Sequence, residues 1–323
     1  MRRRAFLLGV FACAADGIAQ TAKQYRIAYL TGYSAPLDRP LLDALKSGLR
    51  DLGYIEGKSL IIDVEHADGH PERLAALAKR LASRRPDIFV VGSGAAAAEA
   101  VKNVAASTPI VMANVQDPVG SGLVTSLARP GGNITGLSDS HAASVTKRLE
   151  LMKEAIPSLA RVGVLWNPES KTNAAQLKDV RVAASSLALK IDDYPAKNPG
   201  ELESALSKIR GRRGTALLRL GDFVLTTGIP VIARHAIEQR LPAVYTTHRW
   251  TDAGGFMAYG ANFEDLYRRS ALFVDKILKG AKPGDLAIEQ PTKFDLIINL
   301  RTAKAIGIDV PRAVLLRADH VVE

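Results

Sequence analysis

The stretch that decides the fold class is residues 87–112, DIFVVGSGAAAAEAVKNVAASTPIVM. Its continuous apolar run at 87–91 predicts a strand buried on both faces, and the alanine-rich run at 95–106 predicts a helix. The short apolar run at 109–112 predicts the next strand. A strand, a helix and a strand in this order indicate two parallel strands joined by a right-handed crossover, which is typical of an α/β protein.

The same alternation extends from this unit toward the N-terminus. The segment YRIAYLT at 25–31 and the segment at 60–64 predict two more strands. Leucines at helical spacing between 41 and 52 predict a helix that ends at Gly53, and Pro71 begins another helix before the central unit. The first half of the chain therefore reads βαβαβαβ.

The pattern starts again about midway, after a break at RPGGN (129–133) and a short strand at 134–137. The strands expected in the second half are at 162–166, 189–194, 216–220 and 243–245. The helices expected between them are at 174–187, 202–209 and 229–239. We therefore expect two Rossmann-like lobes with parallel sheets and a ligand cleft between the lobes.

The tail of the chain has too few elements to make a lobe of its own. A helix is expected at 263–278, a strand at 294–300 and a short helix at 302–306. These elements should cross back and complete the existing lobes. The expected division is 20–138 plus about 261–288 for lobe 1, and 139–260 plus about 289–323 for lobe 2.

The first residues, MRRRAFLLGVFACAADGIAQ, resemble an export signal. Three arginines precede an apolar run that is too short to span a bilayer, and small residues at 17 and 19 predict a signal peptide of 1–19 with cleavage before Gln20. The route, Sec or Tat, stays open because the motif at 3–7 resembles a twin-arginine signal. Lipid anchoring at Cys13 is disfavoured. Because Cys13 lies within the predicted signal peptide, the expected mature chain is periplasmic and has no cysteine.

Composition places the chain among ordinary soluble globular proteins. Hydrophobic residues make up 47% and charged residues 24%, and the net charge is +10. Most lysines and arginines are scattered along predicted helices, and only Arg210 to Arg213 form a short cluster. Because an exported protein seldom meets nucleic acid, we interpret the charge as a solvated surface and expect no nucleic-acid partner.

Candidate binding residues follow the predicted strands, because parallel α/β sheets bind ligands beyond the carboxyl ends of their strands. Gly92, Ser93, Gly94 and Ala95 lead from a strand into a helix, and free N–H groups there suit a carboxylate or another anion. The alternative is that Ser93 merely caps the helix. The run matches neither nucleotide-binding glycine pattern, which disfavours a nucleotide.

The loops after the other strands supply the remaining candidates. Gln116 and Asp117 follow one strand, although Asp117 with Pro118 also suits the start of a helix. In the second half Asn167 follows a strand, and Asp222 is a candidate partner for a ligand ammonium group. The three tyrosines that could form aromatic walls or pack in the core are Tyr33, Tyr245 and Tyr259.

The sequence contains no pattern typical of an enzyme. The six histidines lack metal-ligand spacing, and Ser93 lacks the context of a nucleophile elbow. We therefore predict no catalytic residue, no metal and no cofactor.

Three motifs carry a family resemblance. They are GSGLVTSLARPGGNITG at 120–136 preceded by DPV, VLWNP at 164–168, and the long segment at 253–311 that begins AGGFMAYGANFEDLYRRS. Together they resemble the ABC transporter substrate-binding proteins of the tryptophan/tyrosine-binding-like family, from about Tyr25 to Glu323. The resemblance implies a type I periplasmic-binding-protein architecture, an amino-acid-like or carboxylate ligand, an ABC permease partner in the inner membrane, and a monomer.

The resemblance also implies a set of ligand-facing positions and a mechanism of lobe closure. It maps the family's loops onto Ser93, Gly94, Ala95, Gln116, Asp117, Asn167 and Asp222. Gly221 stands where proline is frequent in the family, and Gln116 stands where glycine or serine is common. One lobe would hold an anionic end of the ligand and the other would contribute Asp222 and Asn167. A sensing module for a membrane receptor is the alternative function, and a hydrolase is less favoured.

Overall fold

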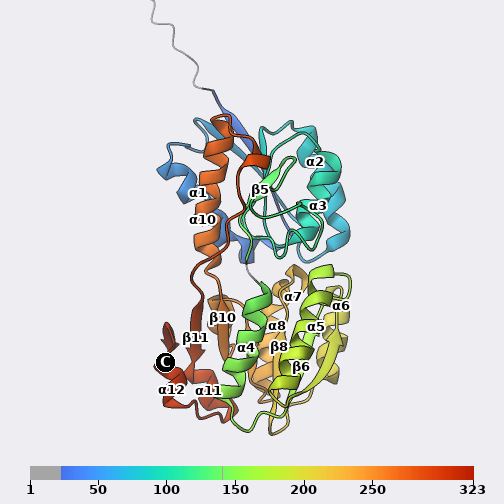
Figure 1. The fold of residues 1–323 in the computed structure, drawn as a ribbon, viewed down its shortest axis with the longest axis vertical. Coiled ribbons are helices and arrows are strands. Elements are labelled where there is room, and N and C mark those ends of the chain that lie inside the picture. The colour runs from blue at the N-terminus through green and yellow to red at the C-terminus, as the bar shows by residue number, and fades with distance from the viewer. Residues whose placement is uncertain (1–22, 140) are drawn as a thin grey trace, which may run out of the picture.

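The computed structural model describes residues 23–139 and 141–323. Figure 1 shows two lobes that follow one another along the long axis, each with a central sheet and helices on both faces. The export signal predicted at 1–19 lies outside the described residues. Within these residues, no helix is both long enough and apolar enough to cross a membrane.

The sheet of lobe 1 has five strands in the order β2-β1-β3-β4-β5, and every pair is parallel. Its strands are β1 (Tyr25–Thr31), β2 (Leu60–His66), β3 (Ile88–Val91), β4 (Ile110–Met112) and β5 (Ile134–Gly136). Its helices from the first half of the chain are α1 (Ala35–Asp51), η1 (Pro71–Arg73), α2 (Leu74–Ser83) and α3 (Ala95–Val104). The predicted βαβαβαβ order is therefore confirmed, with Pro71 opening a short 3₁₀ turn before α2.

The sheet of lobe 2 has seven strands in the order β12-β11-β10-β9-β8-β6-β7. Its strands are β6 (Arg161–Trp166), β7 (Lys190–Pro195), β8 (Thr215–Arg219), β9 (Ala243–Tyr245), β10 (Met257–Gly260), β11 (Asp295–Asn299) and β12 (His320–Val322). Its helices are α4 (His141–Ala155), α5 (Lys171–Ser186), α6 (Pro199–Lys208), α7 (Phe223–Thr227), α8 (Ile229–Glu238), α9 (His248–Asp252), α11 (Leu300–Ile306) and α12 (Arg312–Leu315).

One strand pair departs from the parallel sheet expected from the sequence. β10 and β11 pair antiparallel, with Met257 opposite Ile298. The physical reason is the path of the chain: β10 leads out of lobe 2 into α10 (Phe263–Leu278) of lobe 1, and the chain returns into lobe 2 from that side as β11. A strand that enters the sheet from the other lobe must run opposite to the strand that left it.

Helix α10 belongs in space to lobe 1 although it follows most of lobe 2 in the sequence. It packs along α1 so closely that a Cβ on Gly48 would lie 2.3 Å from the backbone oxygen of Arg268. The Tyr54 hydroxyl donates to Asp275 of α10 at 2.9 Å. The next segment, which includes η2 (Pro283–Asp285), stays on lobe 1, where Glu289 bridges Leu137. This path supports the proposed division in which about 261–288 belongs to lobe 1.

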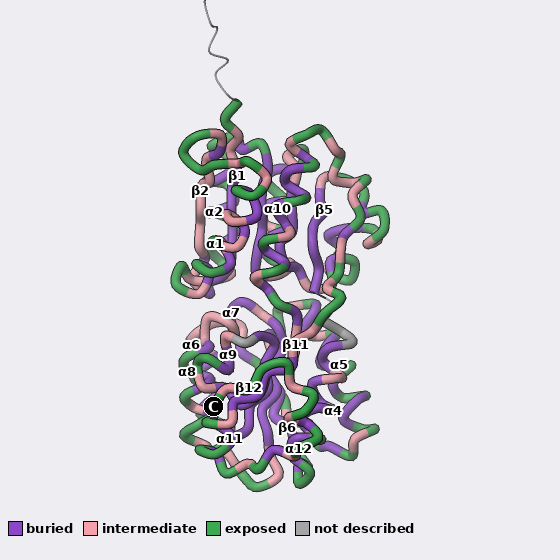
Figure 2. The backbone as a smooth tube through the Cα atoms, turned by 90° about the vertical axis from the view of Figure 1, so that its left-hand side faces the viewer, coloured by how far each residue is buried: buried purple, intermediate pink, exposed green. Residues whose placement is uncertain are grey.

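The hydrophobic core follows the sheets. Figure 2 shows the buried segments running through the middle of each lobe and the exposed ones at the outer loops. Lobe 1 has one large apolar cluster around β1 and β3, and lobe 2 has one cluster on each face of its sheet. Each lobe therefore has its own core, as independent lobes that move against each other require.

Candidate functional site

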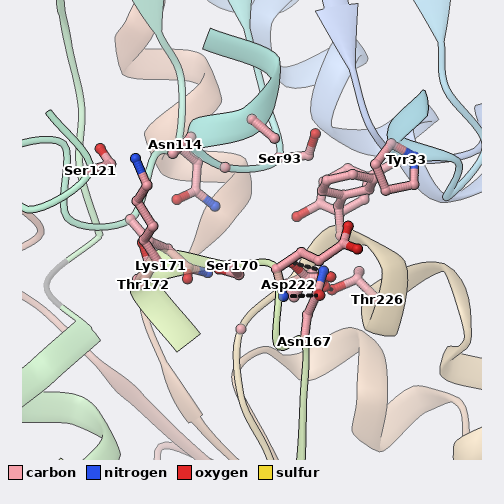
Figure 3. Close-up of a pocket in the computed structure, with 18 of the residues that line it drawn as sticks. Tyr33, Ser93, Asn114, Ser121, Asn167, Ser170, Lys171, Thr172, Asp222 and Thr226 are labelled. Atoms are coloured by element: carbon pink, nitrogen blue, oxygen red, sulfur yellow. Dashed lines mark hydrogen bonds between the residues drawn. The ribbon is translucent and has the colours of Figure 1, made fainter. Parts of the chain in front are cut away.

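A cavity of about 210 Å³ lies between the two lobes. Figure 3 shows its lining side chains pointing toward one another from both lobes. Lobe 1 contributes residues that follow β1, β3 and β4, and lobe 2 contributes residues that follow β6, β8 and β9. The lining comprises Tyr33, Pro71, Ser93, Gly94, Ala95, Ala96, Glu99, Asn114, Gln116, Ser121, Asn167, Glu169, Ser170, Lys171, Thr172, Arg219, Gly221, Asp222, Phe223, Thr226, Thr246 and Phe263.

Most of the predicted binding residues meet at this cavity. Those that line it are Tyr33, Ser93, Gly94, Ala95, Gln116, Asn167 and Asp222. They come from both halves of the chain and meet because the carboxyl ends of the two sheets face the same space. Their contact with a ligand stays a prediction.

Helices α3, α5 and α7 are among those that begin at the cavity, and their first turns differ in how they are capped. Ser170 caps α5 by accepting from the Asn173 N–H at 3.2 Å, and Asp222 caps α7 by accepting from the Val224 N–H at 2.9 Å. Helix α3 begins after Gly94, whose φ is +105°, and no side chain caps it. Of these three helix starts, α3 therefore has the N–H groups with the fewest hydrogen-bond partners. Such free N–H groups favour the binding of an anion.

One of the two roles predicted for Ser93 is wrong, and its contact with a ligand stays a prediction. Gly94, not Ser93, is the N-cap residue of α3, so the capping alternative is wrong. The Ser93 hydroxyl donates to the Gly92 carbonyl and accepts from the Gly32 N–H and from the Thr31 hydroxyl, the last at 3.2 Å. It ties the start of α3 to the end of β1 and leaves the backbone of the loop to face the cavity.

Asp222 and Asn167 form the polar floor of the cavity in lobe 2. The Asn167 side-chain amide donates to Asp222 Oδ2 at 3.2 Å, while Asp222 Oδ1 caps α7. Burial raises the pKa of Asp222 above its ordinary value, and the Val224 N–H, the Asn167 amide and the Arg219 guanidinium oppose this rise. Each carboxylate oxygen keeps one further lone pair, so Asp222 retains capacity to accept from a ligand cation.

Three predicted residues lie away from the cavity. Asp117 has φ +39° and accepts from the Gly120 N–H at 2.8 Å, which closes a turn with no helix after it. Tyr245 is buried and stacks on Trp250, with ring centroids 4.3 Å apart. Tyr259 stacks on Phe294 at 5.8 Å and lines a separate small cavity of about 10 Å³. The two tyrosines therefore pack within lobe 2, which was the alternative for both.

Sequence reasoning missed several lining residues, above all Arg219. It is the last residue of β8, it is 1% exposed, and its carbon Cζ lies 4.5 Å from the centre of the Trp250 ring. Burial lowers the pKa of Arg219 to about 10, so the guanidinium still carries its charge at neutral pH. An arginine within the apolar run ALLRL at 216–220 was the available signal, because charged side chains are rarely fully buried without a specific reason.

The lobes touch beside the cavity. Phe223, at the start of α7 in lobe 2, packs into the apolar cluster of lobe 1, and a Cβ on Gly32 would lie 2.5 Å from its ring. The Arg249 guanidinium of α9 donates to the Leu37 carbonyl of α1. Across the described residues, no group of three His, Cys, Asp or Glu is placed to hold a metal ion.

Residues 35–322 match the family described as "ABC transporter substrate binding protein", and the chain belongs to this family. The family resemblance is thereby confirmed, as is the prediction of a binding protein rather than an enzyme. The chain is 27% identical over 281 residues to a "Tyrosine-binding protein" of Clostridioides difficile. The aligned region covers 86% of this chain and 80% of that protein.

Two solved structures share the fold over more than nine-tenths of the chain. One is an ABC domain from Streptococcus pneumonia in complex with L-Trp, with TM-score 0.85 and 24% identity over 93% of this chain and 100% of that one. The other is a ligand-free, open substrate binding protein with adhesive properties from Clostridium difficile, with TM-score 0.65 and 25% identity over 92% of this chain and 99% of that one.

The position of Tyr245 gives a test that needs no ligand. Its buried hydroxyl has no hydrogen-bond partner in the part of the chain that the structure describes, so Tyr245→Phe should leave the free energy of unfolding unchanged or raise it by up to about 1 kcal/mol. Tyr54→Phe is the matched control, because it removes the bond to Asp275 and should cost about 1 kcal/mol. Urea denaturation measures both. A loss of more than about 1 kcal/mol in Tyr245→Phe would show that its hydroxyl has a polar partner after all.

Proposed function

We propose that this chain is the extracytoplasmic solute-binding component of an ABC importer and that it binds an amino acid, with an aromatic side chain favoured, by closing its lobes. The observation that carries the proposal is the mixed lining of the cavity between the lobes. Lys171, Arg219 and the start of α3 offer positive charge, while Asp222, Glu99 and Glu169 offer negative charge. A zwitterion satisfies both signs at once, and a purely anionic or neutral solute does not.

The aromatic part of the proposal rests on the apolar lining. Tyr33, Phe223 and Phe263 line the cavity and are largely buried, so the lining includes three aromatic rings. An aromatic ligand gains both area burial and ring contacts in such a site. The printed names of two similar proteins, a tyrosine-binding protein and a complex with L-Trp, support the same ligand class.

Closure is supported by the contacts between the lobes. Phe223 and Arg249 of lobe 2 already bind lobe 1, and the fold is more similar to the L-Trp complex than to the ligand-free, open structure at nearly equal identity. A ligand that touches both lobes favours the closed form by its differential contacts. In our proposal an ABC permease of the inner membrane recognises that form, and the protein works as a periplasmic monomer.

Ligand binding by residues 20–323 tests the proposal. We expect a thermal-shift screen of the natural amino acids to give its largest stabilisation with L-tryptophan or L-tyrosine, followed by a calorimetric Kd of about 10 μM or tighter, near −7 kcal/mol. Sugars, myo-inositol and benzoate serve as controls. Stabilisation by a sugar or by benzoate but by no amino acid would rule out the proposed ligand class.

Asp222 should bind the ligand ammonium group, and its two roles can be separated by substitution. Asp222→Ala removes the charge and the cap of α7. Asp222→Asn removes the charge and the acceptor of the Asn167 amide but keeps the cap, because Asn caps helices about as well as Asp. We predict that both weaken binding of the amino acid tenfold or more, about 1.4 kcal/mol, by calorimetry. If Asp222→Asn binds like the wild type, the residue is only a cap.

The same pairing predicts a pH dependence. The ionised form of Asp222 is the form that pairs with an ammonium group, and burial raises its pKa. Affinity for the amino acid should therefore be highest above the raised pKa of Asp222 and decline as the pH falls through it. Because that pKa is raised, the decline should begin at a pH above about 4, the ordinary pKa of Asp. Glu99 and Glu169 also face the cavity, so the contribution of Asp222 is the part of the decline that Asp222→Asn lacks.

A further inference from the structure

Arg219 is a buried cation at the wall of the ligand cavity. It lies at the carboxyl end of β8, lines the cavity and is only 1% exposed. No ion pair joins its guanidinium to a carboxylate of the described residues, and the Asp222 and Asp139 carboxylates act on it only at longer range. Burying a charge is costly unless a partner compensates it, so an unpaired guanidinium in this position needs an explanation.

The hydrogen bonds of Arg219 are incomplete. Nη1 donates to the Leu220 carbonyl at 2.9 Å and Nη2 donates to the Thr226 hydroxyl, but Nε has no hydrogen-bond partner among the described residues. A guanidinium carries five N–H groups, so these bonds leave donors unused in a site almost closed to water. The missing partner is an acceptor, and a carboxylate is the acceptor whose two oxygens fit the planar fork of arginine.

The guanidinium is held rigidly. It stacks on the Trp250 ring, with Cζ 4.5 Å from the ring centre, and Trp250 in turn stacks on Tyr245 at 4.3 Å and 11°. The bonds to Leu220 and Thr226 fix the plane of the fork. A rigid, desolvated donor loses little conformational entropy when it binds an acceptor, which is the property of a recognition residue.

Arg148 shows what a buried arginine with a structural role looks like in the same lobe. It is 0% exposed and donates from Nε to the Ser144 carbonyl at 3.2 Å and from Nη1 to the Arg219 carbonyl at 3.4 Å. It does not line the cavity. Burial and the positive charge of Arg219 lower the pKa of Arg148, and the Asp139 carboxylate raises it.

We propose that Arg219 binds the carboxylate of the amino-acid ligand, so that the charged end of the ligand is seated in lobe 2. This inference rests on the proposed function and sharpens it. The sequence analysis predicts that the carboxylate of the ligand binds at Ser93 and at the start of α3 in lobe 1. The Ser93 hydroxyl, however, is already bonded within lobe 1, which leaves only backbone N–H groups at that position. With Arg219 and Asp222 in the same lobe, lobe 2 recognises the amino-acid end and lobe 1 closes over it.

The test compares L-tryptophan with L-tryptophanamide, which keeps the ring and the ammonium group and lacks the carboxylate charge. For the wild type we expect calorimetry to show that the acid binds about 100-fold more tightly than the amide. In Arg219→Gln this preference should fall to within about threefold. Arg148→Gln is the matched control, since it removes a buried guanidinium away from the cavity and should keep the preference. The same comparison with L-tyrosine and L-tyrosinamide covers the second probe.

Every outcome decides the question. A preference for the acid that persists in Arg219→Gln, or a wild type that binds acid and amide equally, overturns the role of Arg219 while the proposed function stands. A wild type that binds no amino acid overturns both. If Arg219→Gln does not unfold cooperatively in urea, Arg219→Lys is used in its place. Lysine lacks the planar guanidinium, so the preference for acid over amide should fall at least about tenfold. An unchanged preference contradicts the inference.

Discussion

Two parallel sheets whose strands end at the same cavity are the constraint on which the rest of the structure depends. Most strands that end there are followed by a loop and a helix start, and β4 is followed by a loop alone, so backbone N–H groups and polar loop side chains gather where the lobes meet. This arrangement follows from the direction of the strands alone. It explains why residues as distant in sequence as Tyr33, Asn114 and Asp222 line one cavity.

The fold could be predicted from the sequence because apolar runs and helical spacing report local burial directly. The exceptions are instructive. The antiparallel β11 depends on the chain returning from lobe 1, which no local pattern encodes. Helix α4 was missed because Arg148, fully buried, interrupts its apolar face. In the site, the loop positions after strands were predictable, but the hydroxyl of Ser93, the stacking of Tyr245 and the role of Arg219 depend on tertiary contacts.

In the proposed mode of binding, lobe 2 supplies the charged contacts and the two lobes share the apolar contacts. Lobe 2 holds the fixed charges, with Asp222 bonded to Asn167 and Arg219 stacked on Trp250. Phe223 extends from the same lobe into the apolar cluster of lobe 1, against Gly32. The proposed closure would bury apolar surface and remove water from the charged floor, which would strengthen the electrostatic contacts there. A ligand that neutralises the buried guanidinium makes the closed form more favourable than it is without the ligand.

The central claim is that an amino acid closes the lobes, and a distance between them tests it most directly. Residues 20–323 contain no cysteine, so Val104→Cys on α3 and Val182→Cys on α5, both at exposed positions (40% and 70%), can carry a pair of spin labels. Pulsed EPR should give a broad distribution that includes long distances for the free protein and a single, shorter distance with saturating L-tryptophan. An identical distribution in both states, with calorimetry showing the ligand bound, would contradict the account.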